Sequence, residues 1–166
     1  MNFLAQDSPD LQYPVKEVAK DMAKPRWGSW KKLKRVVRYL VKRKAVEWRY
    51  DWQDEPKRIE VITDSDWGGG KGDRKSTSAG VLMLGGHCVK TWSTSQGAIA
   101  LSSAEAEFYA MVEGVLRAKW AVTVAAGMGV KGAHGALLLG TDSAAAKSFV
   151  ARRGLGRMRH LEVRDL

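Results

Sequence analysis

The sequence predicts an α/β fold, a mixed β-sheet flanked by helices, and three observations favour this class. Apolar runs at residues 59–63, 79–84 and 87–92 are typical of three consecutive strands, and the two glycines between the last two runs are a strong hairpin signal. A long helical pattern comes next in the chain. A fourth apolar run, at residues 136–140, follows that helix, which is the pattern of a strand, helix and strand in one sheet.

The first third of the chain has a different character. Residues 1–10 are polar and predict an irregular lead-in. Apolar residues at spacings of three and four predict a helix from Tyr13 to Lys24, which ends before a proline, and an amphipathic, heavily basic helix over residues 27–43. Residues 46–52 alternate aromatic and charged side chains, which is the period of a half-buried strand.

These patterns predict two parts. A chain of 166 residues, 45% of them hydrophobic, is long enough for one domain with a core and an appendage. The polar residues 54–57 separate the first part from the second. We expect residues 1–56 to form a basic helical connection segment with a short strand, and residues 57–166 to form the α/β domain.

The net charge of +10 is concentrated in the first part. Residues 1–58 hold 15 Lys and Arg against 8 Asp and Glu. Such a surplus favours a polyanionic partner, because each phosphate contact releases counterions. The alternatives are a solvated lysine-rich face, a membrane surface or a partner's groove.

Several classes are excluded by what the sequence lacks. Cys88 is the only cysteine, which leaves no disulfide framework and no thiolate zinc site. No apolar run approaches the roughly 18 residues that span a bilayer, and we expect a soluble, intracellular protein without a membrane partner. The glycine cluster at residues 68–72 lacks the order of a phosphate-binding loop and opens no helix.

Helix start signals place the later elements. Residues 102–105 spell a capping box before a helix that we expect to reach Ala126. Ser143 can cap another helix through about Arg152. Residues 159–166 are typical of a further helix that is cut off.

Three carboxylates are the candidate site. Asp64 ends the first strand, Asp142 follows the fourth, and Glu107 begins the core-facing stripe of the long helix between them. If the first and fourth strands are neighbours, these side chains converge at one edge of the sheet. Glu105 falls on the outer side of the helix, where capping explains it. Asp66 is expected either to shape the loop or to support the metal ligands from behind without binding the metal itself.

Three carboxylates without a nearby cation repel one another, and a bound divalent metal ion offsets that repulsion most simply. Hard oxygen ligands favour Mg²⁺ or Mn²⁺ over zinc, and two such ions can activate a water and stabilise a leaving oxygen in phosphodiester cleavage. Taken singly, Asp142 is also explained as a helix cap and Asp64 as a loop acid.

The runs TDSDWGGGKGDRKSTSAGVLMLGG, TWSTSQGAIALSSAEAEFYAMVEG and GTDSAAA, in this order, resemble the ribonuclease H domain of copia-type retrotransposon Pol polyproteins. The upstream run KPRWGSWKKLKRVVRYLVKR looks like the segment that links reverse transcriptase to that domain. The resemblance implies a ribonuclease H-like sheet of five strands, with the first three antiparallel and the fourth parallel to the first.

The resemblance also implies a function. Asp64, Glu107 and Asp142 match the catalytic, metal-binding acids of an endonuclease that cuts the RNA strand of RNA/DNA hybrids during reverse transcription. Its partners would be the hybrid and the reverse transcriptase part of the same polyprotein, in cytoplasmic virus-like particles or, alternatively, in the nucleus. Substrate contacts through phosphate and 2′-hydroxyl groups are expected near five polar residues: Arg74, Ser76, Gln96, Ser102 and Ser143.

One departure from the family pattern stands out. The family's fourth acid lies on a last helix after a fifth strand, in an Ala-Asp context that this sequence does not contain. We expect that strand and helix to be missing beyond Leu166, and neither Glu162 nor Asp165 matches the fourth acid. The alternative functions are a catalytically inactive nucleic-acid-binding remnant and strand transfer, since fold alone does not separate them.

Overall fold

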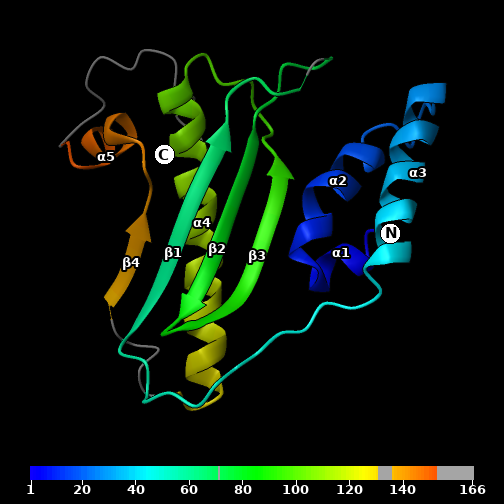
Figure 1. Cartoon of the computed structure of the whole chain (residues 1–166). Helices are drawn as coiled ribbons and strands as arrows, with labels where there is room; N and C mark the ends of the chain where they lie inside the picture. Colours follow the sequence, from blue (N-terminus) through cyan, green and yellow to red (C-terminus); the bar gives the residue numbers. More distant parts are fainter. Residues whose placement is uncertain (71, 131–135, 153–166) are drawn as a thin grey trace. The chain divides into compact units, whose positions relative to one another are not determined.

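A mixed β-sheet and the helices around it make up the regular part of this computed structural model, which describes residues 1–70, 72–130 and 136–152 (Figure 1). In chain order the elements are α1 (Leu4–Asp7), α2 (Pro9–Ala19), α3 (Trp27–Lys42), β1 (Arg58–Asp66), β2 (Thr77–Leu84), β3 (His87–Ser95), α4 (Ser103–Gly127), β4 (Ala136–Gly140) and α5 (Ala144–Val150). By its contacts the chain forms two units. One holds residues 1–52 and 92–94, and the other holds residues 53–91 and the residues from 95 onward.

The sheet has the strand order β3-β2-β1-β4. Residues 59–66 of β1 pair antiparallel with residues 77–84 of β2. Residues 58–62 of β1 pair in parallel with residues 136–140 of β4. The predicted ribonuclease H-like arrangement of these four strands is confirmed, including the parallel pairing of the first strand with the fourth.

The turn between β2 and β3 is the one that its two glycines predict. Gly85 has a φ of +63°, a left-handed conformation that glycine adopts without strain. The side chain of Gln53 closes the turn from outside, because its Oε1 accepts from the Gly86 amide at 2.8 Å and its Nε2 donates to the Leu84 carbonyl at 3.0 Å. The start of the larger unit is therefore tied to the far end of the sheet.

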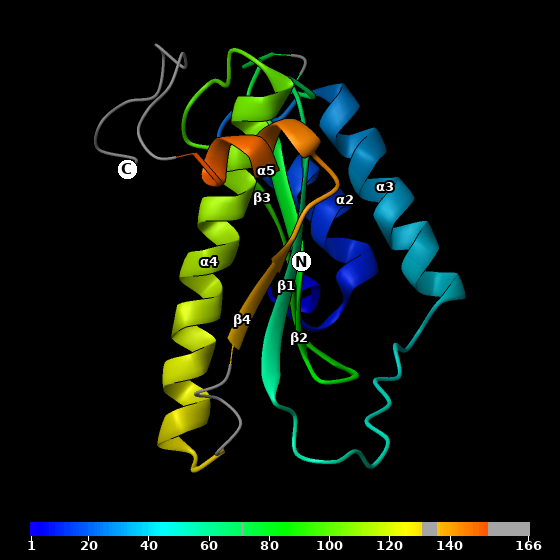
Figure 2. The same ribbon diagram turned by 90° about the vertical axis from the view of Figure 1, so that its left-hand side faces the viewer.

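Helix α4 covers one face of the sheet (Figure 2) and contacts β1, β2 and β4. Its buried side is lined by small residues, among them Ala106, Ala110 and Ala118, all fully buried. The strands that α4 contacts bury Val61 of β1 and Leu82 of β2, which lie opposite each other in the sheet. The close approach of helix and sheet holds the N-terminal turns of α4 near the end of β1.

Gly114 is the point of closest approach, and replacing it tests the packing. A Cβ there would lie 2.5 Å from Thr63 Cγ2 and 3.0 Å from Val61 Cγ1. We expect Gly114→Ala to lower the free energy of unfolding in urea by about 1–2 kcal/mol, because overpacking exceeds the roughly 1 kcal/mol gained in helix propensity. Gly127→Ala on the same helix, with nothing within 4 Å, is the control and should not destabilise. Equal effects of the two substitutions would contradict this packing.

The smaller unit is helical. Its core consists of Ala5, Leu11, Val15 and Val36, so α3 buries one side against α2. Helix α3 begins as predicted and ends one residue early, at Lys42. At its start the Ser29 hydroxyl accepts from the Arg26 amide at 3.1 Å, which satisfies one donor ahead of the first turn.

Two predictions for this unit are wrong. Residues 1–10 are not an irregular lead-in, since α1 and the start of α2 lie there, and α2 ends at Ala19 rather than near Lys24. Pro9, which follows Ser8, begins α2 because proline has no amide proton to lose at the first helical position. Apolar spacing alone began the predicted helix at Tyr13, one turn too late.

The predicted strand over residues 46–52 is also wrong, because this segment is neither helix nor strand. A period of two indicates a strand only where a partner supplies ladder hydrogen bonds. Here the rings of Trp48 and Tyr50 stack on each other, 6.4 Å apart, and Trp48 Nε1 donates to the Asp7 carbonyl at 2.9 Å. The alternation therefore reflects local stacking. The expected helix over residues 159–166 lies outside the described residues, and the boundary at residue 56 stays a prediction.

The environment of Glu105 differs from the prediction in one respect. Its carboxylate caps α4 as expected, because Oε2 accepts from the Leu101 amide at 2.8 Å and the Ser102 hydroxyl accepts from the Glu105 amide at 3.2 Å. The residue is nevertheless buried rather than on the outer side. The Tyr109 hydroxyl donates to Oε1 at 3.0 Å and covers it.

Candidate metal centre

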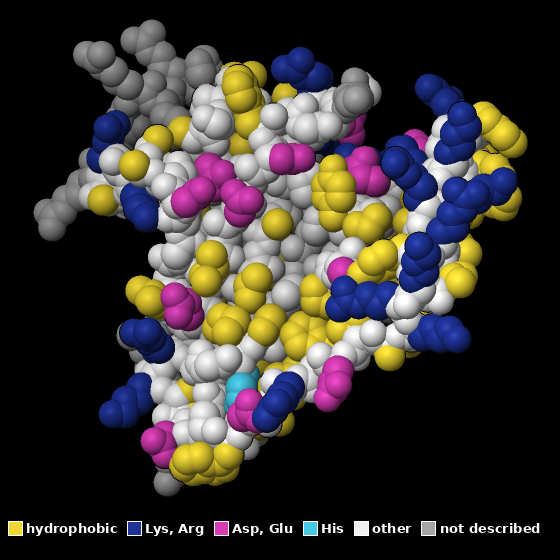
Figure 3. Space-filling view, viewed as in Figure 1, with side chains coloured by type: hydrophobic (Ala, Val, Ile, Leu, Met, Phe, Trp, Pro, Cys, Tyr) yellow, Lys and Arg dark blue, Asp and Glu magenta, His cyan; other side chains and the backbone are white. Residues whose placement is uncertain are grey.

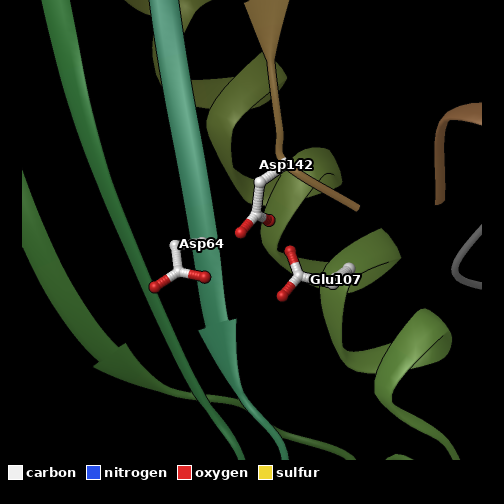
Figure 4. A group of neighbouring side chains, drawn as sticks. All are labelled: Asp64, Glu107 and Asp142. Carbon is white, nitrogen blue, oxygen red and sulfur yellow. The ribbon is translucent and has the colours of Figure 1, made fainter. Parts of the chain in front are cut away.

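The three predicted carboxylates converge at one end of the sheet (Figure 4). Asp64 lies near the end of β1, Asp142 lies two residues beyond β4, and Glu107 lies in the second turn of α4. Because β1 and β4 are parallel neighbours, their C-terminal ends meet at the same edge, and α4 begins there. One carboxylate oxygen of each residue lies within 4.8 Å of those of the other two.

Glu107 is the fixed member of the group. It is buried, whereas Asp64 and Asp142 are exposed. Its Oε1 accepts from the Ser65 hydroxyl at 2.9 Å and from the Ser65 amide at 3.2 Å. The Thr141 hydroxyl donates to Oε2 at 3.5 Å. Glu107 therefore points from α4 toward the strand ends.

In the part of the chain that the structure describes, the three carboxylates lack a basic side chain to balance them. In the described residues, no lysine or arginine forms an ion pair with Asp64, Glu107 or Asp142. Burial raises the pKa of the Glu107 carboxyl above its ordinary value, and the charges of the two aspartates act in the same direction. The hydrogen bonds from Ser65 lower this pKa in part. A divalent cation at this position would relieve both the burial and the repulsion.

Ser65 and Thr141 are the contacts that sequence reasoning missed. Both stand next to a predicted aspartate, in TDSDW and GTDS, so a signal existed in the paired hydroxyl residues at the two strand ends. Whether such a hydroxyl reaches a helix depends on which side of the strand it faces. Ser65 shares the α4-facing side of β1 with Val61 and Thr63, which contact Gly114 of that helix.

The structure places the five predicted substrate-contacting residues in different environments. The Ser76 hydroxyl is fully buried and accepts from the Gly68 amide at 3.1 Å. The Gln96 side chain is also buried and donates to Ser78 Oγ at 3.0 Å and to the Ala106 carbonyl at 2.8 Å. These two side chains hold the loop and strand ends together.

The remaining three predicted contacts lie nearer the surface. Ser102 and Ser143 cap helices, since their hydroxyls accept from the amides of Glu105 and Ala146. Arg74 is exposed and has a φ of +56°, an uncommon value for a residue with a side chain. Of the five, Arg74 has the side chain most open to a ligand.

Asp66, two residues beyond Asp64, shapes the loop as predicted. Its carboxylate accepts from the Thr77 amide and so closes the turn between β1 and β2. A Cβ at Gly69 would overlap this carboxylate. Asp66 thus belongs to the scaffold that carries the candidate metal centre.

The protein is thus an α/β protein with a ribonuclease H-like sheet and a candidate divalent metal centre. The three carboxylates of this centre lie near the ends of β1 and β4 and near the start of α4. No family model matches the chain, and no solved structure matches it. Several curated proteins, however, are similar to this chain in sequence. The chain is 32% identical over 120 residues to secreted RxLR effector protein 161 of Plasmopara viticola, covering 72% of this chain and 84% of that protein.

Two further relatives come from Arabidopsis thaliana. The retrovirus-related Pol polyprotein from transposon RE2 is 28% identical over 134 residues, which is 81% of this chain and 9% of the polyprotein. The polyprotein from transposon RE1 is 26% identical over 131 residues, 79% of this chain and 9% of the polyprotein. The polyprotein matches over most of the chain identify it as a retrotransposon Pol-derived region, which confirms the resemblance found in its motifs. It spans only a small part of the two polyproteins.

Within the described ranges, no helix combines the length and the apolar character needed to cross a bilayer.

Proposed function

We propose that this chain is a metal-dependent endonuclease that cleaves the RNA strand of RNA/DNA hybrids during retrotransposon reverse transcription. The observation that carries the proposal is the convergence of Asp64, Glu107 and Asp142 from three elements onto one point at the sheet edge. The motifs around these residues resemble those of copia-type ribonuclease H domains. The named relatives support the retrotransposon origin.

The donor set suits Mg²⁺ or Mn²⁺. All three side chains offer hard carboxylate oxygens, and no histidine or cysteine joins the group that the described residues form. When two ions are bound, they supply a polarised water as nucleophile and stabilise the leaving oxygen of the phosphodiester. The raised pKa of Glu107 agrees with a position that a cation would occupy.

The protein's own groups have distinct parts in this proposal. Glu107 is held by Ser65, so it keeps its orientation while the substrate comes and goes. Asp64 and Asp142 are exposed, which leaves a side of the group open to a phosphate. Arg74, exposed in the glycine-containing loop, is the predicted side chain best suited to meet the nucleic-acid backbone.

The reverse transcriptase of the same polyprotein is the proposed protein partner. The support is the upstream segment, which looks like the piece that links the two enzymes, and the match to Pol polyproteins over most of the chain. Such a link would deliver the hybrid from one site to the other without release.

A cleavage assay tests the function. End-labelled RNA/DNA hybrid should be cut in the presence of Mg²⁺ or Mn²⁺ and left intact in EDTA, while DNA duplex and RNA duplex of the same sequence should resist. The 2′-hydroxyl groups distinguish the RNA strand, which is cut, from the DNA strand. The geometry of the hybrid distinguishes it from DNA duplex and RNA duplex. Binding of the hybrid without cleavage at any metal concentration would replace the proposal with the inactive nucleic-acid-binding alternative. The charge of +10 favours binding in both cases, so only cleavage separates them.

A further inference from the structure

Helix α3 has a solvent-facing side that its packing against α2 does not use. Its buried residues are Ser29 and Val36. On the opposite side, residues at spacings of four, three, four and four form one exposed row along the helix: Trp27, Lys31, Lys34, Arg38 and Lys42. Figure 3 shows Lys and Arg side chains gathered over this helix. The 16 residues of α3 include no Asp or Glu.

The positive charge of this row is not balanced within the unit. Two cations toward α2 are paired: Lys32 lies 3.1 Å from Asp21, and Arg43, just beyond the helix, lies 3.3 Å from Asp10. In the described residues, no carboxylate forms an ion pair with the four cations of the row. The row therefore offers its full charge to an anionic partner.

Two tryptophans stand among these cations. Trp27 is 70% exposed and Trp30 is 47% exposed, values far above those of a packed tryptophan. The Lys34 ammonium lies 5.3 Å from the centre of the Trp30 ring. Flat aromatic rings beside cations bind unpaired bases by stacking and hold their phosphates by charge.

An anionic membrane fits this side of the helix less well. A helix that lies in a membrane interface needs a continuous apolar face. Val36 of α3 is already packed in the core of the unit. The large apolar and aromatic residues of the helix that stay exposed are Trp27, Trp30, Val37, Tyr39 and Val41. On the outer side Lys34 stands between Trp27 and Val41, so burying the two apolar residues in lipid would bury its charge with them.

We propose that the row on α3 is a binding site for single-stranded nucleic acid. Successive cations are about 4.5–6 Å apart along the helix, so neighbouring phosphates of one strand can meet neighbouring cations. Bases of the same strand stack on Trp27 and Trp30. The residues of this site belong to the smaller unit, and the inference does not rest on the proposed nuclease activity.

Fluorescence anisotropy with a short labelled oligothymidylate, in EDTA and over a salt series, tests the proposal. Replacing Lys31, Lys34 and Arg38 with Gln should weaken binding at low salt. It should also reduce the slope of log affinity against log salt by roughly two, since each lost contact on a single strand contributes about 0.7. The matched control removes the same charge from exposed Lys57, Lys119 and Lys147, each changed to Gln, and should leave the slope unchanged.

The tryptophans give a second readout. Trp27→Ala and Trp30→Ala should each weaken binding to the oligothymidylate by about tenfold, and should affect a DNA duplex much less, because paired bases are not available for stacking. Circular dichroism should show that α3 is intact in every variant. Equal losses in the row variant and the matched control would overturn the proposal, as would tryptophan variants that bind normally. Stronger binding to phosphatidylserine vesicles than to the oligonucleotide would assign the surface to a membrane instead.

A substitution at the carboxylate site tests whether strand binding by α3 is independent of hybrid cleavage. Asp64→Asn should bind oligothymidylate in EDTA as the unsubstituted chain does. If the unsubstituted chain binds oligothymidylate but does not cleave the hybrid, the proposed function fails and this inference stands. If it cleaves the hybrid but does not bind oligothymidylate, this inference alone fails.

Discussion

Asp64→Asn is expected to abolish metal-dependent cleavage of the hybrid and to weaken Mn²⁺ binding at least about 100-fold. Removing only a hydrogen-bonding partner of a metal ligand already costs 10–100-fold in affinity or activity, and here a ligand itself is lost. The amide of Asn keeps the size of the side chain but carries no charge. The loss should therefore appear in metal binding without a comparable loss of stability.

Calorimetric titration with Mn²⁺ and the hybrid cleavage assay measure the two effects. Glu60→Gln is the control. Glu60 lies on the same strand as Asp64, and the substitution removes a carboxylate that does not belong to the converging group. Asp142→Asn should behave like Asp64→Asn. If Asp64→Asn binds Mn²⁺ and cuts at the rate of the unsubstituted chain, Asp64 is not a metal ligand and the proposed function fails.

Glu107→Gln is expected to raise the stability of the metal-free chain at neutral pH and to lower its response to metal. Burial raises the pKa of Glu107 in the folded state above the ordinary value of 4.5 that applies to the unfolded chain. Stability from the protonated carboxyl is thus fully present below the unfolded pKa and is lost as pH rises through the folded pKa. Gln stays neutral throughout, and its oxygen can still accept from Ser65.

Urea unfolding in EDTA at several pH values between about 4 and 8 measures this difference. The advantage of Glu107→Gln should be small at the acid end, grow as pH rises and then level off. Millimolar Mg²⁺ should stabilise the unsubstituted chain and much less the variant, because a ligand that binds only the folded state adds stability. An advantage that does not change with pH would show that burial does not disfavour the charged Glu107 carboxylate. Equal stabilisation of both chains by Mg²⁺ would show that Glu107 is not a metal ligand.

Local patterns were sufficient where a signal lies within a few residues. The hairpin followed from two adjacent glycines, and the start of α4 followed from its capping box. The three carboxylates were predicted from their places at strand ends and on a core-facing helical stripe. The parallel pairing of β1 and β4 then confirmed why they meet.

Local patterns failed where neighbours far along the chain decide the outcome. Residues 46–52 alternate like a strand but form none in the structure, where β1, β2, β3 and β4 make up the sheet of the described residues. Ser76 and Gln96 are polar loop residues in the sequence, yet both are buried and hydrogen-bonded inside the fold. A polar residue with its partners supplied is stable in the interior, and those partners are not visible in a local window.

The α/β class, most of the helices and strands, and the three candidate acids could be predicted from the sequence alone, because periodicity, caps and turns act over short distances. The folded chain was needed to show that Ser65 holds Glu107 and that Gly114 admits the close approach of α4. It was also needed to show that, among the described residues, no carboxylate forms an ion pair with the cations of α3 on the side away from α2. Each of these depends on which faces the folding chain brings together. The spacing of residues in the sequence does not contain that choice.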